Sequence, residues 1–207
     1  KPKKTGLVLT VDRSGSMSGS FERQVVPSLL YVAKKGFELN IPVKLVLYDS
    51  RAEIVVYDES NYQRVIGALR VTGSTCFKAA FEKTWEAICL LPSDLDEVVI
   101  GFLTDGQNTD VPYDGALAQL KDNLRKARFG SVCHSIAFSS GHDFAFLNAL
   151  RATLGVKEGG FQYAEPGDGP NALEDKLSAV FDVAAVRRVE CKLSVALNGF
   201  QFLSATG

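Results

Sequence analysis

The fold of this chain is decided by residues 7–16, which read LVLTVDRSGS. The first five are almost all apolar, as is typical of a strand buried on both faces of a parallel sheet. One carboxylate and two hydroxyls follow directly, on Asp12, Ser14 and Ser16. These side chains are two residues apart at a strand end, so their oxygens can surround one point. Oxygen-only ligation with few charges suits a hard divalent ion such as magnesium.

The composition is that of an ordinary globular protein. The chain has 207 residues, of which 46% are hydrophobic and 23% charged, and this length suits one domain with a sizeable core. A formal net charge of −1 gives no reason to expect a nucleic-acid partner. Apolar runs are no longer than a strand, so we expect no membrane span.

The cysteines predict free thiols rather than a metal site or disulfides. Cys76, Cys89, Cys133 and Cys191 show no CxxC spacing, which argues against zinc. Free, mostly buried thiols favour a reducing compartment. The chain has no Asn-x-Ser/Thr glycosylation sequence, which agrees with that interpretation. We therefore expect an intracellular location.

Strand-like and helix-like segments alternate along the chain. We expect strands over residues 7–11, 43–48, 52–57, 98–103, 131–138 and 160–164, and helices over residues 21–39, 61–69, 77–90, 113–127, 143–154 and 171–186. Pro27 should kink the first helix or mark its start, and Gly130 should end the fourth. The connection between the second and third strands is very short, which predicts an antiparallel pair.

This alternation predicts an α/β fold with a doubly wound, mostly parallel, Rossmann-like sheet, one antiparallel edge strand and helices on both faces. Residues 5–186 form this domain. Polar and apolar residues alternate over residues 190–197, which is typical of a half-exposed strand. Residues 187–207 are therefore expected to be an extra strand or the start of a following module.

Further oxygen ligands should gather at the edge where Asp12 lies, because ligands of open parallel sheets bind beyond the carboxyl ends of the strands. Asp105 follows the strand at 98–103, and Thr75 precedes the helix at 77–90. Each piece has a simpler interpretation: the serines could cap the next helix, and Asp105 could belong to a turn. Three segments that converge on one sheet edge favour a metal site.

The pattern also resembles the metal-ion-dependent adhesion site (MIDAS) of von Willebrand factor type A domains. That site combines Asp-x-Ser-x-Ser with a threonine in a later loop and an aspartate after a later strand. All five positions are matched here, by Asp12, Ser14, Ser16, Thr75 and Asp105. The resemblance spans roughly residues 5–186. It implies that the serines and the threonine contact the ion, while the aspartates act through water.

Two carboxylates balance one divalent cation, so an open coordination position should attract an acidic side chain of a partner. We therefore predict a metal-dependent module that binds a protein ligand through its Asp or Glu. Mg²⁺ is the expected ion, with Mn²⁺ or Ca²⁺ as alternatives. Gly15, Gln107, Asn108 and residues 139–142 should shape the rim. Many extracellular members of the family join their ends by a disulfide, but no cysteine lies near the amino end here, which argues against an extracellular role.

Two alternative functions remain open. Asp12 could serve a magnesium-dependent phosphoryl transferase or hydrolase as nucleophile or metal ligand. The sequence has no phosphate loop, dinucleotide turn or nucleophile elbow, so we expect no enzyme. His134 falls within a strand and should be structural, and His142 has no paired nucleophile. The ion could instead only stabilise a scaffold. The helix at 171–186 either couples ligand binding to shape, as the resemblance implies, or simply packs on the sheet.

Overall fold

Six strands form one sheet in the computed structural model, which describes residues 3–155, 157–165, 167–169 and 171–188. In chain order the strands are β1 (Thr5–Asp12), β2 (Val43–Tyr48), β3 (Ala52–Val55), β4 (Glu97–Thr104), β5 (Gly130–Phe138) and β6 (Lys157–Ala164). They are arranged β3-β2-β1-β4-β5-β6 across the sheet. Every pair is parallel except β2 with β3, which is antiparallel. The predicted fold class is confirmed.

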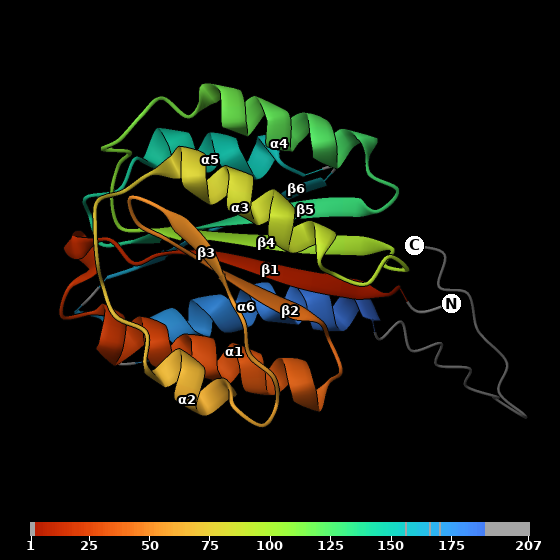
Figure 1. The fold of residues 1–207 in the computed structure, drawn as a ribbon, viewed down its shortest axis with the longest axis horizontal. Coiled ribbons are helices and arrows are strands. Elements are labelled where there is room, and N and C mark those ends of the chain that lie inside the picture. The colour runs from red at the N-terminus through yellow and green to blue at the C-terminus, as the bar shows by residue number, and fades with distance from the viewer. Residues whose placement is uncertain (1–2, 156, 166, 170, 189–207) are drawn as a thin grey trace, which may run out of the picture.

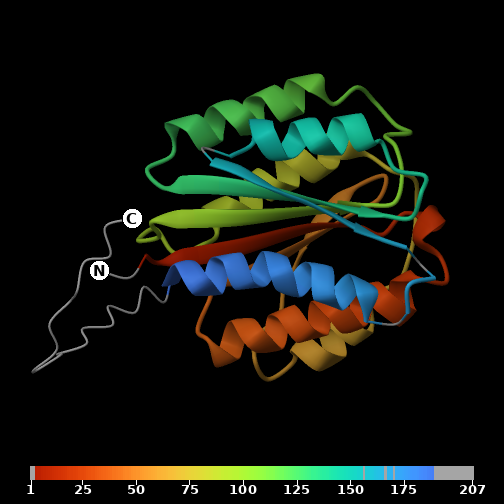
Figure 2. The same ribbon diagram turned by 180° about the vertical axis from the view of Figure 1, so that it is seen from behind.

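Helices cover both faces of this sheet (Figures 1 and 2). They are α1 (Val26–Glu38), α2 (Tyr62–Gly67), α3 (Phe77–Cys89), α4 (Asp114–Lys126), α5 (Phe144–Thr153) and α6 (Ala172–Arg188). One face carries α1, α2 and α6, and the other carries α3, α4 and α5. Within the described residues, no helix combines the length and apolar character needed to cross a bilayer.

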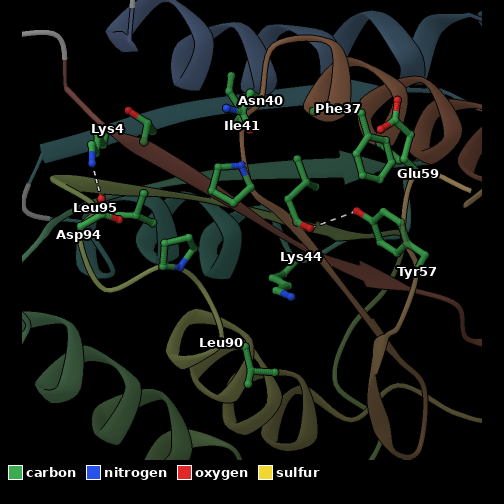
Figure 3. A pocket seen from close by; sticks show the side chains of 16 residues that line it. Lys4, Phe37, Asn40, Ile41, Lys44, Tyr57, Glu59, Leu90, Asp94 and Leu95 are labelled. Carbon is green, nitrogen blue, oxygen red and sulfur yellow. Dashed lines mark hydrogen bonds and ion pairs between the residues drawn. The ribbon is translucent and has the colours of Figure 1, made fainter.

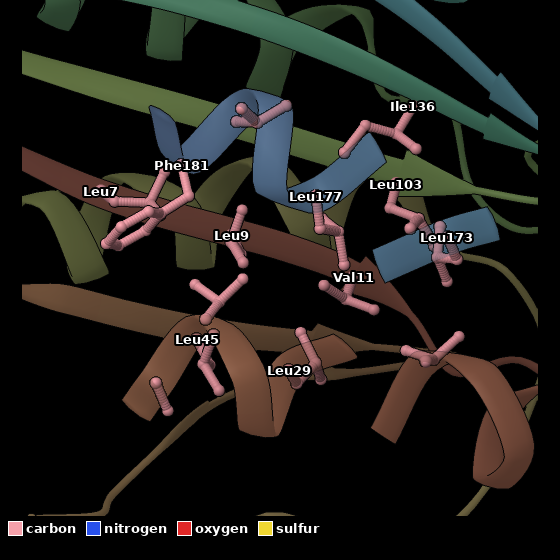
Figure 4. Packing of buried hydrophobic residues seen from close by; sticks show 14 of the residues in the cluster. Leu7, Leu9, Val11, Leu29, Leu45, Leu103, Ile136, Leu173, Leu177 and Phe181 are labelled. Carbon is pink, nitrogen blue, oxygen red and sulfur yellow. The ribbon is translucent and has the colours of Figure 1, made fainter. Parts of the chain in front are cut away.

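The central strand β1 is buried along its whole length because both of its faces are covered. Side chains alternate between the faces of a strand. Leu7, Leu9 and Val11 therefore pack toward α1 and α6 (Figure 4), whereas Val8 packs in the core beneath α3. Burying a leucine or valine side chain contributes about 1.5–3 kcal/mol. This packing holds the carboxyl end of β1 in a fixed place, and Asp12 is the last residue of that strand.

Two local predictions meet different outcomes. A π-helical turn occupies Phe21–Val25, and α1 then starts with Pro27 in its first turn. Pro27 thus marks the start of the regular helix, where a missing amide hydrogen does no harm. The prediction that Gly130 ends the fourth helix is wrong. That helix stops at Lys126, and Gly130 is the first residue of β5, where it pairs with Glu97.

The predicted domain boundary falls at the limit of the described residues. Helix α6 extends to Arg188, two residues beyond the predicted end of the domain. The strand predicted over residues 190–197 lies outside the described residues, as does nearly all of the segment 187–207.

Candidate metal-binding site

Asp12 is held in a fixed orientation at the carboxyl edge of the sheet. Its Oδ1 accepts a hydrogen bond from the Ser14 amide at 2.8 Å, and its Oδ2 accepts one from the Thr104 hydroxyl at 2.7 Å. The residue has no exposed surface. Sequence reasoning missed Thr104, although it directly precedes Asp105 at the end of the neighbouring strand β4. Position at a predicted strand end was the signal that could have found it.

A chain of hydrogen bonds connects both serines to the second aspartate. The hydroxyls of Ser14 and Ser16 lie 3.0 Å apart, and the Ser16 hydroxyl donates to Asp105 Oδ1 at 2.8 Å. Together with the bond from the Ser14 amide to Asp12, these hydrogen bonds connect four of the five predicted residues. The helix-cap interpretation of the serines is not supported, because the Ser14 hydroxyl makes no cap bond to the short 3₁₀ turn that follows it.

Thr75 lies on an adjacent loop that main-chain hydrogen bonds join to the site. The amide of Thr72 donates to the Arg13 carbonyl at 2.9 Å, and the amide of Gly15 donates to the Gly73 carbonyl at 3.1 Å. The Thr75 amide donates to the Thr109 hydroxyl at 3.1 Å, and the Thr109 amide returns a bond to the Thr75 carbonyl at 3.0 Å. Thr75 is thus positioned through its backbone, whereas side chains join the other four residues.

Gly73 allows this loop to approach the turn between β2 and β3 closely. Its φ angle is +68°, which L side chains rarely adopt. A Cβ atom here would lie 2.8 Å from the Ser50 hydroxyl and 3.0 Å from the Asp49 Cβ. Glycine therefore meets both a conformational and a steric requirement.

The pKa values of both carboxylates at the site are raised by burial. Burial raises the pKa of Asp12 to about 6, although hydrogen bonds from Ser14 and Thr104 lower it and the charge of Asp105 adds to the increase. Burial also raises the pKa of Asp105, against a hydrogen bond from Ser16. Among the residues that the structure describes, no Lys, Arg or His pairs with either carboxylate.

The donor chemistry is rich in hydroxyls and poor in charge. In the described part of the chain, no group of three or more His, Cys, Asp or Glu side chains is placed to hold a metal. The available ligands are instead two carboxylates together with serine and threonine hydroxyls. Such a set suits a hard cation that keeps several of its waters. The residues present therefore fit the ion that the sequence predicted.

Residues predicted at the rim have different roles. Gly15 and Gln107 are exposed beside the site. Asn108 instead connects the start of α3 to its own loop. Its Oδ1 accepts a hydrogen bond from the Phe77 amide at 2.9 Å, and its Nδ2 donates to the Asp110 and Val111 carbonyls. The amide side chain of Asn108 thus anchors the loop instead of extending into the rim.

The residues after β5 and the histidine within it also have defined contacts. The hydroxyl of Ser139 donates to the Asp105 carbonyl at 3.3 Å, so the loop 139–142 lies beside the site, as predicted. His134 is structural, as predicted, because its Nδ1 accepts from the Gly160 amide at 2.9 Å.

A separate hollow of about 640 Å³ lies at the amino edge of the sheet (Figure 3). Its lining mixes apolar side chains such as Phe37 and Leu90 with charged ones such as Lys44 and Glu59. The Tyr57 hydroxyl donates to the Val43 carbonyl at 3.1 Å, and Lys4 pairs with Asp94 at the rim. None of the five predicted ligand residues lines this hollow. The candidate ligand residues therefore lie away from this hollow, toward the carboxyl edge of the sheet.

No protein-family model matches this sequence, and no curated protein matches it significantly. The fold, however, is similar to several solved structures. The von Willebrand factor domain of the type V pili tip protein from Porphyromonas gingivalis has a TM-score of 0.61 and 14% identity, covering 89% of this chain and 97% of that domain. This chain therefore has a von Willebrand factor type A-like fold.

Two further structures share the fold. A mutant of the PilB minor pilin from Streptococcus sanguinis has a TM-score of 0.63 and 14% identity over 91% of this chain. Proximal thread matrix protein 1 from the mussel byssus, with a zinc-occupied MIDAS motif, has a TM-score of 0.62 and 13% identity over 88% of this chain. The chain spans only 62% of the pilin and 46% of the matrix protein.

Proposed function

We propose that this domain binds a protein partner through a divalent cation. The observation that carries the proposal is the hydrogen-bonded chain from Asp12 through Ser14 and Ser16 to Asp105, which gathers two carboxylates without a positive partner among the described residues. Buried charges are normally paired or bound to a metal. A divalent cation would balance both carboxylates.

The proposed ligands are the hydroxyls of Ser14, Ser16 and Thr75, with Asp12 and Asp105 acting through water, as the resemblance to the MIDAS implies. Mg²⁺ is the proposed ion because all of these donors are oxygens. Mn²⁺ and Ca²⁺ are alternatives, and the zinc in the similar byssus protein adds Zn²⁺ to the ions worth testing. The bound ion supplies a positive centre for a ligand.

We propose that the ligand is an Asp or Glu side chain of another protein. The two carboxylates balance the charge of one divalent ion, and the other proposed ligands are neutral hydroxyls. The site therefore carries no excess negative charge that would repel an acidic side chain. We propose no catalytic role. The similar structures are pilin and matrix proteins, which agrees with a binding function.

Metal binding is tested by calorimetric titration of the purified domain with Mg²⁺, Mn²⁺, Ca²⁺ and Zn²⁺. Replacing Ser16 with alanine removes the hydroxyl that connects Ser14 to Asp105. Ser16→Ala should therefore weaken Mg²⁺ binding, and Ser18→Ala, an exposed serine of the same loop, should not. Equal affinities of these two variants would reject the proposed ligand set.

Partner binding is tested by comparing proteins captured in Mg²⁺ with those captured in chelator. A partner identified in this way should lose affinity for the domain in chelator and for the Ser16→Ala variant. Thermal unfolding of the same samples separates recognition from a purely structural ion. Lost binding by a folded variant supports recognition, whereas unchanged affinity in chelator rejects the metal bridge.

A further inference from the structure

Four aromatic side chains from the loop after β5, the start of α5 and strand β6 form a partly exposed row. We call His142, Phe144, Phe161 and Tyr163 the aromatic row. The Phe144 and Phe161 rings are 5.1 Å apart between centroids, and the His142 ring lies 6.2 Å from Phe161 and 5.3 Å from Tyr163. Phe144 is 57% exposed and Tyr163 36% exposed. Large aromatic surfaces in contact with solvent are common at sites of protein recognition.

The aromatic row is continuous with the candidate metal site. The loop 139–142, which carries His142, contacts Asp105. The Ser139 hydroxyl donates to the Asp105 carbonyl, and a Cβ on Gly141 would lie 3.2 Å from the same oxygen. Ser139 has a φ of +71°, and its carbonyl lies 2.5 Å from His142 Nδ1. A ligand held at Asp105 would therefore have the aromatic row as its neighbour.

Two carboxylates, those of Glu165 and Asp168, flank the end of the row. The Tyr163 hydroxyl donates to Glu165, and the Glu165 amide donates to Asp168 Oδ2 at 2.9 Å. The hydrogen bond to Glu165, together with burial and the charges of Glu165 and Asp168, raises the pKa of Tyr163 to about 12. Within the described ranges, no Lys, Arg or His forms an ion pair with either acid.

We infer that the aromatic row, with Glu165 and Asp168, binds an arginine side chain of the protein partner. A guanidinium stacks on aromatic faces and pairs with carboxylates through several N–H groups. An apolar side chain would bury the two acids without compensation, which is unfavourable. The inference extends the proposed function: the partner would present an acidic side chain to the metal and an arginine to the row.

The inference is tested by adding N-acetyl-arginine amide to the ¹⁵N-labelled domain at pH 7.5 and recording amide chemical shifts. Chelator is present throughout, so the result does not depend on metal binding. We expect saturable shifts at residues 142–144 and 161–165, and weaker binding of N-acetyl-leucine amide. Equal or stronger binding of the leucine compound would mean an apolar site and overturn the inference, as would the absence of shifts with arginine.

A charge-removing variant gives a second test. The double substitution Glu165→Gln with Asp168→Asn should weaken binding of the arginine compound about three- to fivefold, because it removes the ion pairs but keeps the rings. Glu38→Gln on α1, on the opposite face of the sheet, is the control and should bind normally. Unchanged binding by the double variant would overturn the inference. Failure of Mg²⁺ binding would instead reject only the metal proposal.

Discussion

Arg13 and Asp49 form a largely buried ion pair, in which Nε lies 2.8 Å from Oδ2 and the two side chains are 16% and 6% exposed. Asp49 also accepts from the Arg51 amide at 2.8 Å and, through its carbonyl, from the Cys76 amide at 2.8 Å. The Arg13 carbonyl accepts from the Thr72 amide. The pair therefore joins the turn between β2 and β3 to two of the three segments that carry candidate metal ligands, those of Ser14 and Thr75.

Asp49→Asn should weaken Mg²⁺ binding by roughly 10- to 100-fold, the usual effect of losing a residue that orients metal ligands. Asparagine keeps the size of the side chain but loses the charge that attracts Arg13. Calorimetric titration measures the change. Glu53→Gln is the matched control, because Glu53 also pairs with Arg13 but its side chain is 56% exposed. Such a pair contributes little, so equal losses in the two variants would contradict the prediction.

Stability without metal should decrease as the pH rises. The pKa of Asp12 is about 6 in the folded protein and near its ordinary value of 3.8 in the unfolded chain. The folded state therefore binds the proton more tightly, and this contribution is complete below about pH 4 and lost as the pH rises through 6. Its size is about 3 kcal/mol. Urea unfolding in chelator measures it, and Asp12→Asn should flatten the profile over this range.

Added Mg²⁺ should raise the unfolding temperature more at pH 7 than at pH 5. The ion stabilises the folded state by mass action, and it needs the ionised carboxylates. Protons compete for Asp12 and Asp105 at the lower pH because both pKa values are raised by burial. Thermal scans at the two pH values, with and without Mg²⁺, provide the measurement. A larger shift at pH 5 would be evidence against ligation by these two acids.

Gly101→Ala should destabilise the domain by about 1–3 kcal/mol, a typical effect of overpacking. A Cβ at this position in β4 would lie 2.6 Å from Leu9 Cδ2 and 3.4 Å from Val180 Cγ1 on α6. Gly115→Ala on α4 is the control, because nothing lies within 4 Å of its Cβ position. That change should stabilise the helix by up to about 1 kcal/mol. Denaturant unfolding measures the stability of both variants. A Gly115→Ala variant less stable than Gly101→Ala would refute the packing argument.

The sequence predicted the sheet well because its signals were local. An apolar run that ends in Asp12 defines a buried strand and its carboxyl edge, and topology then brings Asp105 to the same edge. Contacts that depend on tertiary structure were missed. The hydroxyl of Thr104 donates to Asp12, 92 residues away. The place of Thr104 at a strand end was a signal, but the spacing along the chain does not identify its partner. Gly130 was misassigned because a glycine that opens a strand looks the same as one that ends a helix.

The fold does not test the predicted intracellular location. Cys76 and Cys133 are buried and free, and Cys89 is exposed and free. These thiols were the basis for an intracellular location, which stays a prediction. The identity of the metal and the roles of the five ligand residues likewise stay proposals until titration.

The direction of α6 determines where the described chain ends relative to its start. Phe181 packs near Leu7 at the start of β1, whereas Leu173 lies near Leu103 at the other end of the sheet (Figure 4). The helix thus runs back, so that the described chain enters and leaves at one pole (Figure 2). A neighbour tethered there would lie at the pole opposite the loops of the candidate metal site and would leave those loops accessible.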